Sequence, residues 1–179
     1  MKHVLFGALL GCLLATPALA ALKPGDAAPG FTAPATLAGK EFTFSLADKL
    51  KDGPVVLYFY PAAFTQGCSV EAHDFAEATD RFKALGATVI GVSADKLDVL
   101  DKFSTADCQS KFALAADPEL KVAKAYDAVL TKMRGYADRT SYVITPDGKV
   151  LYSYSAMDPD KHVENTMAAL EKWRAEHKG

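Results

Sequence analysis

The sequence predicts an α/β sandwich, a single domain in which helices cover both faces of a mixed β-sheet. Two continuous apolar runs, residues 55–60 and 87–92, have the pattern of strands that are buried on both faces. Residues at helical spacing follow the first run, and a hairpin signal precedes a last helical segment near the end of the chain. Because parallel strands are joined by right-handed crossovers, such helices cover the sheet.

Length and charge exclude several classes of protein. The chain has 179 residues, of which 50% are hydrophobic, and this suits one well-packed domain better than two. The formal net charge is −2 and basic residues do not cluster, so nucleic acid is not an expected partner. No apolar run of about 18 residues or more occurs after the first twenty residues, so we expect no integral membrane segment in the mature chain.

The first twenty residues have the composition of a cleavable signal peptide. Lys2 and His3 form a short charged start, and residues 4–15 are apolar. Residues 16–20 then end in the small-x-small pattern of a cleavage site. This composition predicts export of the protein to an oxidising compartment.

Cleavage is expected after Ala20, which leaves one mature domain over residues 21–179. One alternative is an uncleaved anchor, although the apolar stretch is short for a membrane span. The other alternative is a lipoprotein with its lipid on Cys12, although this leaves apolar residues directly after the lipidated position.

The first part of the mature chain is expected to wrap the surface and then enter the sheet. Residues 23–40 are punctuated by proline and glycine, and a short strand is expected near residues 41–45. The buried strand at residues 55–60 follows a turn-like Asp-Gly-Pro sequence. A helix comes next, and Gly86 fits the position just past its end. Its apolar residues at helical spacing are Phe75, Ala78, Phe82 and Leu85.

After the second buried strand at 87–92, a helix and a hairpin are expected. The helix covers residues 96–106, with Ser93 or Asp95 as its N-cap. The hairpin strands, residues 141–145 and 150–154, flank a Pro-Asp-Gly-Lys turn.

Two Asp-Pro pairs predict the starts of two further helices. Asp117 and Asp158 each precede a proline, as an N-cap precedes a proline in the first helical turn. We therefore expect helices over residues 118–126 and 159–177. This order of strands and helices, with a terminal hairpin and helix, predicts an α/β sandwich of the thioredoxin-like type.

The chemistry of the chain is expected at Cys68. This residue follows the buried strand at 55–60 and stands at or near the N-terminus of the next helix, three residues after Thr65. Unpaired backbone N–H groups and the positive end of the helix dipole favour a thiolate there over a thiol. The thiolate is the nucleophilic form of cysteine.

The residues around Cys68 resemble the active site of a known family. The spacing Pro61-x-x-x-Thr65-x-x-Cys68 matches the signature of the peroxiredoxins, and its surroundings resemble the bacterioferritin-comigratory (peroxiredoxin Q) branch. Further similar segments lie at residues 25–31, 89–93 and 139–144, so the resemblance covers essentially all of the mature chain. Together with the signal peptide, the resemblance implies a bacterial periplasmic protein.

The resemblance implies a thiol peroxidase with Cys68 as its peroxidatic nucleophile. Peroxide reduction needs hydrogen-bond donors around the sulfur and the two oxygens. The Thr65 hydroxyl and the backbone N–H groups of Gly67 and Cys68 are candidates, and Arg139 supplies several donors and a permanent positive charge. Pro61 would shield the sulfur from water. The first product is a sulfenic acid.

Each assignment has a structural alternative. Cys68 would then be an inert buried thiol, Arg139 a solvated surface charge, and Thr65 only a helix cap. Pro61 would only end the strand. Glu71 resembles a family glutamate that organises the pocket, but a glutamate in the first helical turn is favourable for dipole reasons alone.

Two cysteines remain after signal cleavage, Cys68 and Cys108, so a disulfide between them is possible. Many members of the branch carry a resolving cysteine five residues after the first, where this chain has His73. Other members place it in the helical region where Cys108 lies in a polar stretch. We therefore predict that Cys108 resolves the sulfenic acid as an intramolecular disulfide. The alternative is a one-cysteine mechanism with an external thiol.

The resemblance implies a hydroperoxide substrate and a reducing partner, either a thioredoxin-like protein or a small thiol. It implies no metal, haem, flavin or nicotinamide. His73 and Cys68 would supply only two ligands for a metal ion. We expect a monomer. Two other functions remain open: a disulfide-exchange enzyme, although Cys68 lacks a Cys-x-x-Cys partner, and a non-catalytic redox sensor that uses the same thiolate.

Overall fold

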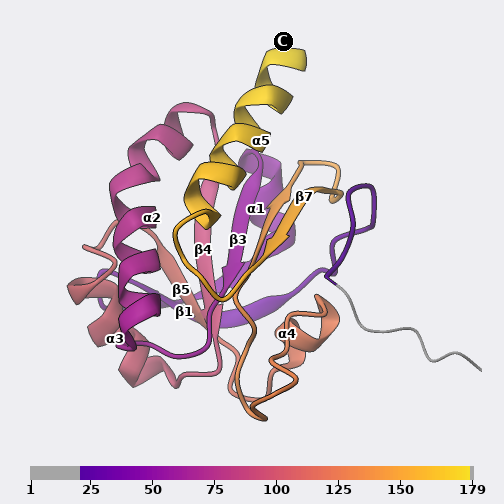
Figure 1. Ribbon diagram of the computed structural model, residues 1–179. Coiled ribbons are helices and arrows are strands. Elements are labelled where there is room, and N and C mark those ends of the chain that lie inside the picture. The colour runs from indigo at the N-terminus through magenta and orange to yellow at the C-terminus, as the bar shows by residue number, and fades with distance from the viewer. Residues whose placement is uncertain (1–20, 178–179) are drawn as a thin grey trace, which may run out of the picture.

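The computed structural model describes residues 21–177 (Figure 1). The predicted signal peptide, residues 1–20, lies outside the described part of the chain. Within that part, no helix is long and apolar enough to cross a membrane.

The described residues form one seven-stranded mixed sheet with the strand order β2-β1-β5-β4-β3-β6-β7. The three central strands β5, β4 and β3 are parallel to one another, and the strands outside them pair antiparallel. The strands are β1 Thr32–Leu37, β2 Lys40–Ser45, β3 Val55–Phe59, β4 Thr88–Ser93, β5 Ala113–Ala116, β6 Thr140–Ile144 and β7 Val150–Ser155.

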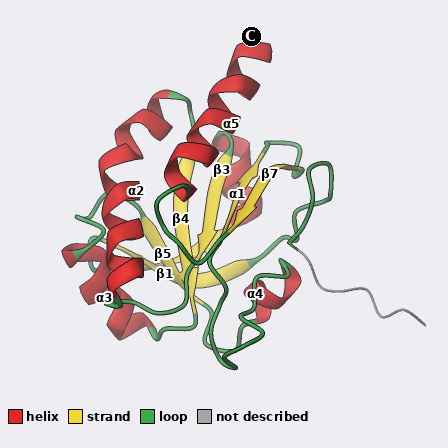
Figure 2. Cartoon of the chain, viewed as in Figure 1, coloured by secondary structure: helices red, strands yellow, loops and turns green. Residues whose placement is uncertain are grey.

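Helices cover both faces of the sheet (Figure 2). They are α1 Leu46–Asp52, α2 Gln66–Ala84, α3 Leu97–Ala106, α4 Lys121–Ala125 and α5 His162–Glu176. The central strand β3 separates two apolar layers, because alternate residues of a strand point to opposite faces. Val56 and Tyr58 pack with residues of α2, α3 and α5, whereas Leu57 and Phe59 pack with residues of α1 and α4. This confirms the predicted thioredoxin-like sandwich.

Several predicted segments are confirmed within a residue or two: the strands near 41–45, 55–60 and 87–92, the helix that carries Cys68, and the helix at 96–106. The C-terminal hairpin is also confirmed, as β6 and β7. Three elements were not predicted. They are β1, which lies inside the segment expected to be surface loop, and the short elements α1 and β5.

The predicted caps and the starts of two helices were wrong. The N-cap of α3 is Lys96, and no side chain caps it, because Ser93 and Asp95 bond to each other instead. Helix α4 begins at Lys121 rather than at 118, after Leu120 in a left-handed conformation with φ 55°. Asp117 still accepts hydrogen bonds from the backbone of Lys121 and Ala123, so it anchors the start of α4 from a distance.

Helix α5 begins later than predicted. Its first residue is His162 and its N-cap position is Lys161, so the Asp158-Pro159 pair precedes the helix instead of opening it. The carboxylate of Asp158 accepts a hydrogen bond from the N–H of Asp160, which forms a local turn. The later start places His162, rather than Pro159, in the first helical turn.

Candidate active site

The site begins at the junction of β3 and α2. Thr65 is the N-cap residue of α2, and the first backbone hydrogen bond of the helix runs from the N–H of Ser69 to the carbonyl of Thr65 at 2.8 Å. The N–H groups of Gly67 and Cys68 therefore lie in the first turn, where no intrahelical acceptor exists. Cys68 is 2% exposed. Its sulfur lies at the positive end of the helix dipole, as the sequence predicted.

The pairing of β6 with β3 brings Arg139 to Cys68. Thr140, the first residue of β6, is the antiparallel partner of Phe59, the last residue of β3. Arg139 therefore stands beside the loop that leads into α2. Its Nη2 donates a hydrogen bond to the sulfur of Cys68 at 3.4 Å, and its Nε donates to the carbonyl of Met157 at 3.0 Å. The alternative of a solvated surface arginine is wrong, because Arg139 is 3% exposed.

Glu71 holds the other side of the guanidinium. It lies three residues after Cys68 on α2, is fully buried, and accepts a short hydrogen bond through Oε2 from Nη1 of Arg139. Burial raises the pKa of Glu71 to about 8, although the charge of Arg139 opposes this. Burial lowers the pKa of Arg139, but the charges of Glu71 and Cys68 outweigh it and raise that pKa overall. The first turn of α2 holds no acidic residue, so the dipole alternative for Glu71 is wrong.

Gly67 allows the guanidinium to lie against the helix. A Cβ at this position would be 3.1 Å from Nη2 of Arg139, which is closer than nearly all real contacts of a Cβ. A larger residue would displace the group that reaches Cys68. The sequence predicted a backbone donor at Gly67, whereas the structure adds this steric reason for glycine.

Thr65 and Pro61 both lie between β3 and α2. The Thr65 hydroxyl donates to the carbonyl of Ala62 at 2.9 Å and makes no capping bond, so the alternative of a simple side-chain cap is wrong. Its oxygen can still accept a hydrogen bond. Pro61 is half-buried, and β3 ends two residues before it, which agrees with the view that it limits the strand. The roles of both residues in catalysis stay predictions.

Two polar residues that support the site were not identified in the sequence. Asp95 follows β4 and accepts hydrogen bonds from the backbone N–H of Ala63 and from Ser93, both at 2.8 Å, so it fixes the loop before α2. The sequence could have indicated Asp95, because the parallel strands β3 and β4 end at the same edge of the sheet. His162 is fully buried and lies 3.5 Å from the free oxygen of Glu71. A single histidine near a helix start gives no such signal.

Cys108 lies in the core, although its neighbours in the sequence are polar. It is fully buried in the same apolar cluster as Cys68, and both thiols are free. Burial raises the pKa of Cys108 far above its ordinary value. Burial also raises the pKa of Tyr58, which belongs to the same apolar cluster. Cys108 follows α3, and the next two residues, Gln109 and Ser110, have φ of 49° and 59°.

His73 occupies the position of the second cysteine of the branch and is exposed on α2. Its Nε2 lies 3.0 Å from Glu77, and its Nδ1 lies 2.9 Å from the amide of Gln109. Among residues 21–177, no three metal-ligating side chains lie close enough together to hold an ion.

Comparison with known proteins identifies the family. A model of the AhpC/TSA family matches residues 24–153. The chain belongs to the AhpC/TSA family. This peroxiredoxin is 33% identical to the chloroplastic peroxiredoxin Q of Oryza sativa subsp. japonica over 180 residues, which cover 92% of this chain and 81% of the relative. It is 32% identical to the chloroplastic peroxiredoxin Q of Sedum lineare over 139 residues, which cover 77% and 74%.

Solved structures agree with this assignment. The crystal structure of Peroxidoxin BcpB from Mycobacterium tuberculosis superposes with a TM-score of 0.77 and 32% identity, covering 84% of this chain and 97% of that one. Peroxiredoxin Q of Xanthomonas campestris superposes with a TM-score of 0.69 and 27% identity, covering 78% and 89%. The protein is thus a peroxiredoxin of the Q type and a thiol-dependent peroxidase, an oxidoreductase that uses hydroperoxides and thiol reductants.

Proposed function

We propose that the peroxidase reaction takes place at Cys68 and that Arg139 polarises both the sulfur and the bound peroxide. The observation that carries this proposal is the 3.4 Å contact between Nη2 and Sγ inside a buried site. A guanidinium is a permanent cation with fixed donors, and its electrostatic effect is larger where water is excluded. The same group is placed to stabilise the negative charge that develops on the leaving oxygen.

In this mechanism the thiolate of Cys68 attacks one oxygen of the hydroperoxide. An S–O bond forms and the O–O bond breaks, and the electron pair of that bond leaves with the second oxygen. The leaving oxygen takes up a proton and departs as water or an alcohol, while sulfur is oxidised to a sulfenic acid. Thr65 and the N–H groups of Gly67 and Cys68 are the proposed donors and acceptors for the two oxygens. Pro61 is proposed to limit the access of water.

Cys108 is the proposed resolving residue. Its thiol condenses with the sulfenic acid of Cys68, which releases water and forms a disulfide, and an external dithiol or two thiols then reduce this bond. Support comes from the apolar cluster that the two free thiols share. Because burial keeps Cys108 in the unreactive thiol form, the segment that holds it has to open before resolution.

Mass spectrometry of peroxide-treated protein tests this mechanism. We expect a peptide that joins Cys68 to Cys108, no peroxidase activity in Cys68→Ser, and a sulfenic acid that persists in Cys108→Ser. Absence of the joined peptide, together with full multi-turnover activity of Cys108→Ser, would establish the one-cysteine mechanism with an external thiol instead. A single turnover in the presence of excess reductant would identify a redox sensor.

We also propose that the protein is exported to a bacterial periplasm and acts there as a monomer. Support for export is the charged start, the apolar stretch and the small-x-small sequence that ends at Ala20. The expected reductant is a thioredoxin-like protein of that compartment or a small thiol. Expression of the full chain in a Gram-negative host tests the location. The osmotic-shock fraction should contain protein that begins at Ala21, whereas a lipid on Cys12 or an intact N-terminus contradicts the proposal.

A further inference from the structure

A buried histidine lies close to the carboxyl group of Glu71 that Arg139 contacts. His162 is the first residue of α5 and is fully buried. Its Nδ1 lies 3.5 Å from Oε1 of Glu71, while Arg139 contacts the other carboxylate oxygen, Oε2. The histidine therefore extends the series of contacts that runs from the sulfur through the guanidinium to the carboxyl group.

Its surroundings fix which ring nitrogen carries the hydrogen. Nε2 lies 2.9 Å from the carbonyl oxygen of Ala156, which only accepts, so Nε2 is the donor. The N–H of Ala156 in turn donates to the carbonyl of Arg139 at 3.2 Å. Nδ1 is thus the nitrogen that gains or loses a proton, and the hydroxyl of Ser141 lies 2.8 Å from it. A serine hydroxyl can donate to the neutral ring or accept from the protonated one.

The second oxygen of Glu71 needs a donor. Within the described residues, Oε1 is buried and has no hydrogen-bond partner. An unpaired buried carboxylate oxygen is costly, because it has lost its hydration without compensation. A proton on Glu71 or on His162 gives Oε1 and Nδ1 an attractive interaction across the 3.5 Å that separates them.

The net charge of the buried groups also favours one additional proton. A thiolate at Cys68, a guanidinium at Arg139, a carboxylate at Glu71 and a neutral imidazole add up to one net negative charge. One additional proton makes the buried cluster neutral, which is strongly favoured in a medium of low polarity.

We propose that His162 is a positioning residue of the peroxidase site that shares one proton with Glu71. While this proton is present, the buried groups are neutral overall and Arg139 remains available to the sulfur and the peroxide. This inference rests on the proposed role of Cys68 as the reacting sulfur.

The directions in which the pKa values of Glu71 and His162 shift agree with this arrangement. Burial raises the pKa of Glu71 to about 8, and burial lowers the pKa of His162 from its ordinary value. Near neutral pH the shared proton therefore resides mainly on the carboxyl group, with the imidazole neutral. Above about pH 8 the proton leaves, and the negative charge that remains opposes the charge developing on the leaving oxygen.

Other groups face the pair from each element packed against it. They are Asp74 on α2, Tyr58 on β3, Asp138 and Arg139 before β6, Tyr154 on β7 and Asp158 before α5. Asp74 acts in the expected sense, since its charge raises the pKa of Glu71.

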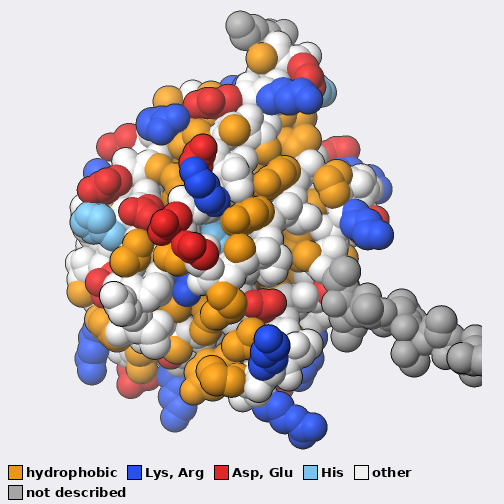
Figure 3. Space-filling view, viewed as in Figure 1, with side chains coloured by type: hydrophobic (Ala, Val, Ile, Leu, Met, Phe, Trp, Pro, Cys, Tyr) orange, Lys and Arg blue, Asp and Glu red, His pale blue; other side chains and the backbone are white. Residues whose placement is uncertain are grey.

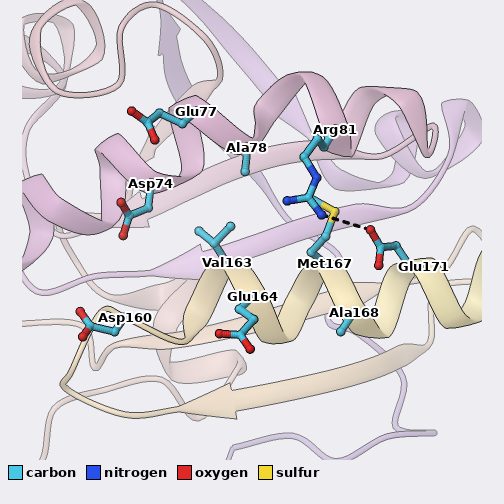
Figure 4. Close-up of a pocket in the computed structure, with 10 residues that line it drawn as sticks. All are labelled: Asp74, Glu77, Ala78, Arg81, Asp160, Val163, Glu164, Met167, Ala168 and Glu171. Atoms are coloured by element: carbon cyan, nitrogen blue, oxygen red, sulfur yellow. Dashed lines mark hydrogen bonds and ion pairs between the residues drawn. The ribbon is translucent and has the colours of Figure 1, made fainter.

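Asp74 itself is half-buried on α2. It lines a cleft of about 550 Å³ between α2 and α5, whose other acidic residues are Glu77, Asp160, Glu164 and Glu171 (Figure 4). Acidic side chains gather over this part of the surface (Figure 3). Of these acidic residues, Asp74 is the one whose charge raises the pKa of Glu71, which favours the protonated state that the proposal requires.

The test is the pH dependence of the reaction of Cys68 with one equivalent of hydrogen peroxide, measured between about pH 5 and 10. The wild-type rate should fall on the alkaline side as the shared proton leaves. Glu71→Gln keeps an acceptor for Arg139 but does not titrate, so this alkaline limb should disappear. His162→Gln keeps a donor for Ala156 but removes Nδ1. The limb should then move to lower pH by about one unit, because Glu71 alone binds the proton less tightly.

His73→Gln is the matched control, since it removes an exposed histidine from α2, and its profile should superpose on that of the wild type. Thermal unfolding checks that each variant is folded. A His162→Gln profile equal to the wild type, or an unchanged alkaline limb in Glu71→Gln, overturns the inference. If Cys68→Ser still reduced peroxide, the proposed function itself would fail, and the two failures are therefore distinguishable.

Discussion

Nη2 of Arg139 lies 3.4 Å from Sγ of Cys68, although 71 positions separate the two residues in the chain. The contact depends on the sheet, because β6 begins opposite the end of β3 and delivers the arginine to the start of α2. It also depends on Glu71 and on the carbonyl of Met157, which hold the remaining guanidinium nitrogens. The arginine is therefore fixed before any peroxide binds.

Arg139→Lys should lower kcat/KM for hydrogen peroxide by about 100-fold. An ammonium group keeps the charge but lacks the planar fork, so it cannot contact the sulfur, the carboxylate and the Met157 carbonyl together. The measurement is the steady-state rate at several peroxide concentrations. Arg134→Lys, at an exposed position, is the control and should behave as the wild type. A loss of less than threefold in Arg139→Lys would contradict the polarising role.

Gly67→Ala should lower the rate of Cys68 oxidation by about tenfold and leave the fold intact. The added methyl group would lie 3.1 Å from Nη2 of Arg139, so the guanidinium has to move away from the sulfur. Stopped-flow oxidation with hydrogen peroxide measures this effect. Gly30→Ala is the matched control, because a Cβ there meets no heavy atom within 4 Å. Equal rates for the two variants would show that the close approach at Gly67 is unimportant.

The contribution of Glu71 to the stability of the protein should fall as the pH rises from about 4.5 to about 8. The folded state holds the proton of Glu71 up to about pH 8, whereas the unfolded state releases it near the ordinary value of 4.5. Between these values the folded state binds more protons at Glu71, so this contribution to the free energy of unfolding decreases by up to about 1.4 kcal/mol per pH unit.

Urea unfolding at several pH values measures this slope, and Glu71→Gln should flatten it. The exposed Glu164→Gln is the control and should keep the wild-type slope. Parallel curves for the wild type and Glu71→Gln would mean that Glu71 is ionised in the folded state throughout this range.

Asp95→Ala should cost about 1–3 kcal/mol of stability and reduce peroxidase activity. The substitution leaves the backbone N–H of Ala63 and the hydroxyl of Ser93 without their acceptor, so the loop before α2 loosens. Chemical denaturation and peroxide consumption measure the two effects. Asp98→Ala removes an exposed carboxylate from the start of α3 and should have the smaller effect on both. An active Asp95→Ala of normal stability would show that this loop needs no such anchor.

The strongly patterned elements could be predicted from the sequence, and the weak ones could not. The apolar strand β3 and the long helix α2 follow from hydrophobic periodicity alone. By contrast, β1 contains Pro34, and β5 is a run of three alanines and one leucine with little strand preference. Both become strands because each pairs with neighbours, β1 with β2 and β5, and β5 with β4 and β1. Such pairing is a tertiary effect that local sequence does not contain.

The candidate site divides in the same way. Cys68 could be identified from its place at a helix start, and Arg139 from the resemblance to peroxiredoxins, yet no local pattern says that the two touch. The burial of Cys108 could not be predicted, because the residues beside it are polar, whereas tertiary packing holds the thiol in the core. His162 was missed for the opposite reason, since an isolated histidine has no spacing from which a partner could be inferred.

The backbone is strained at the two residues that follow Cys108. Gln109 and Ser110 both adopt left-handed conformations, with φ of 49° and 59°, which cost about 1–2 kcal/mol for each residue with a side chain. In the proposed mechanism, release of this backbone strain would offset part of the free energy needed to move the sulfur of Cys108 out of the core. The strained segment after α3 would thus favour opening of the region around Cys108, and replacement of both residues by glycine would remove this strain.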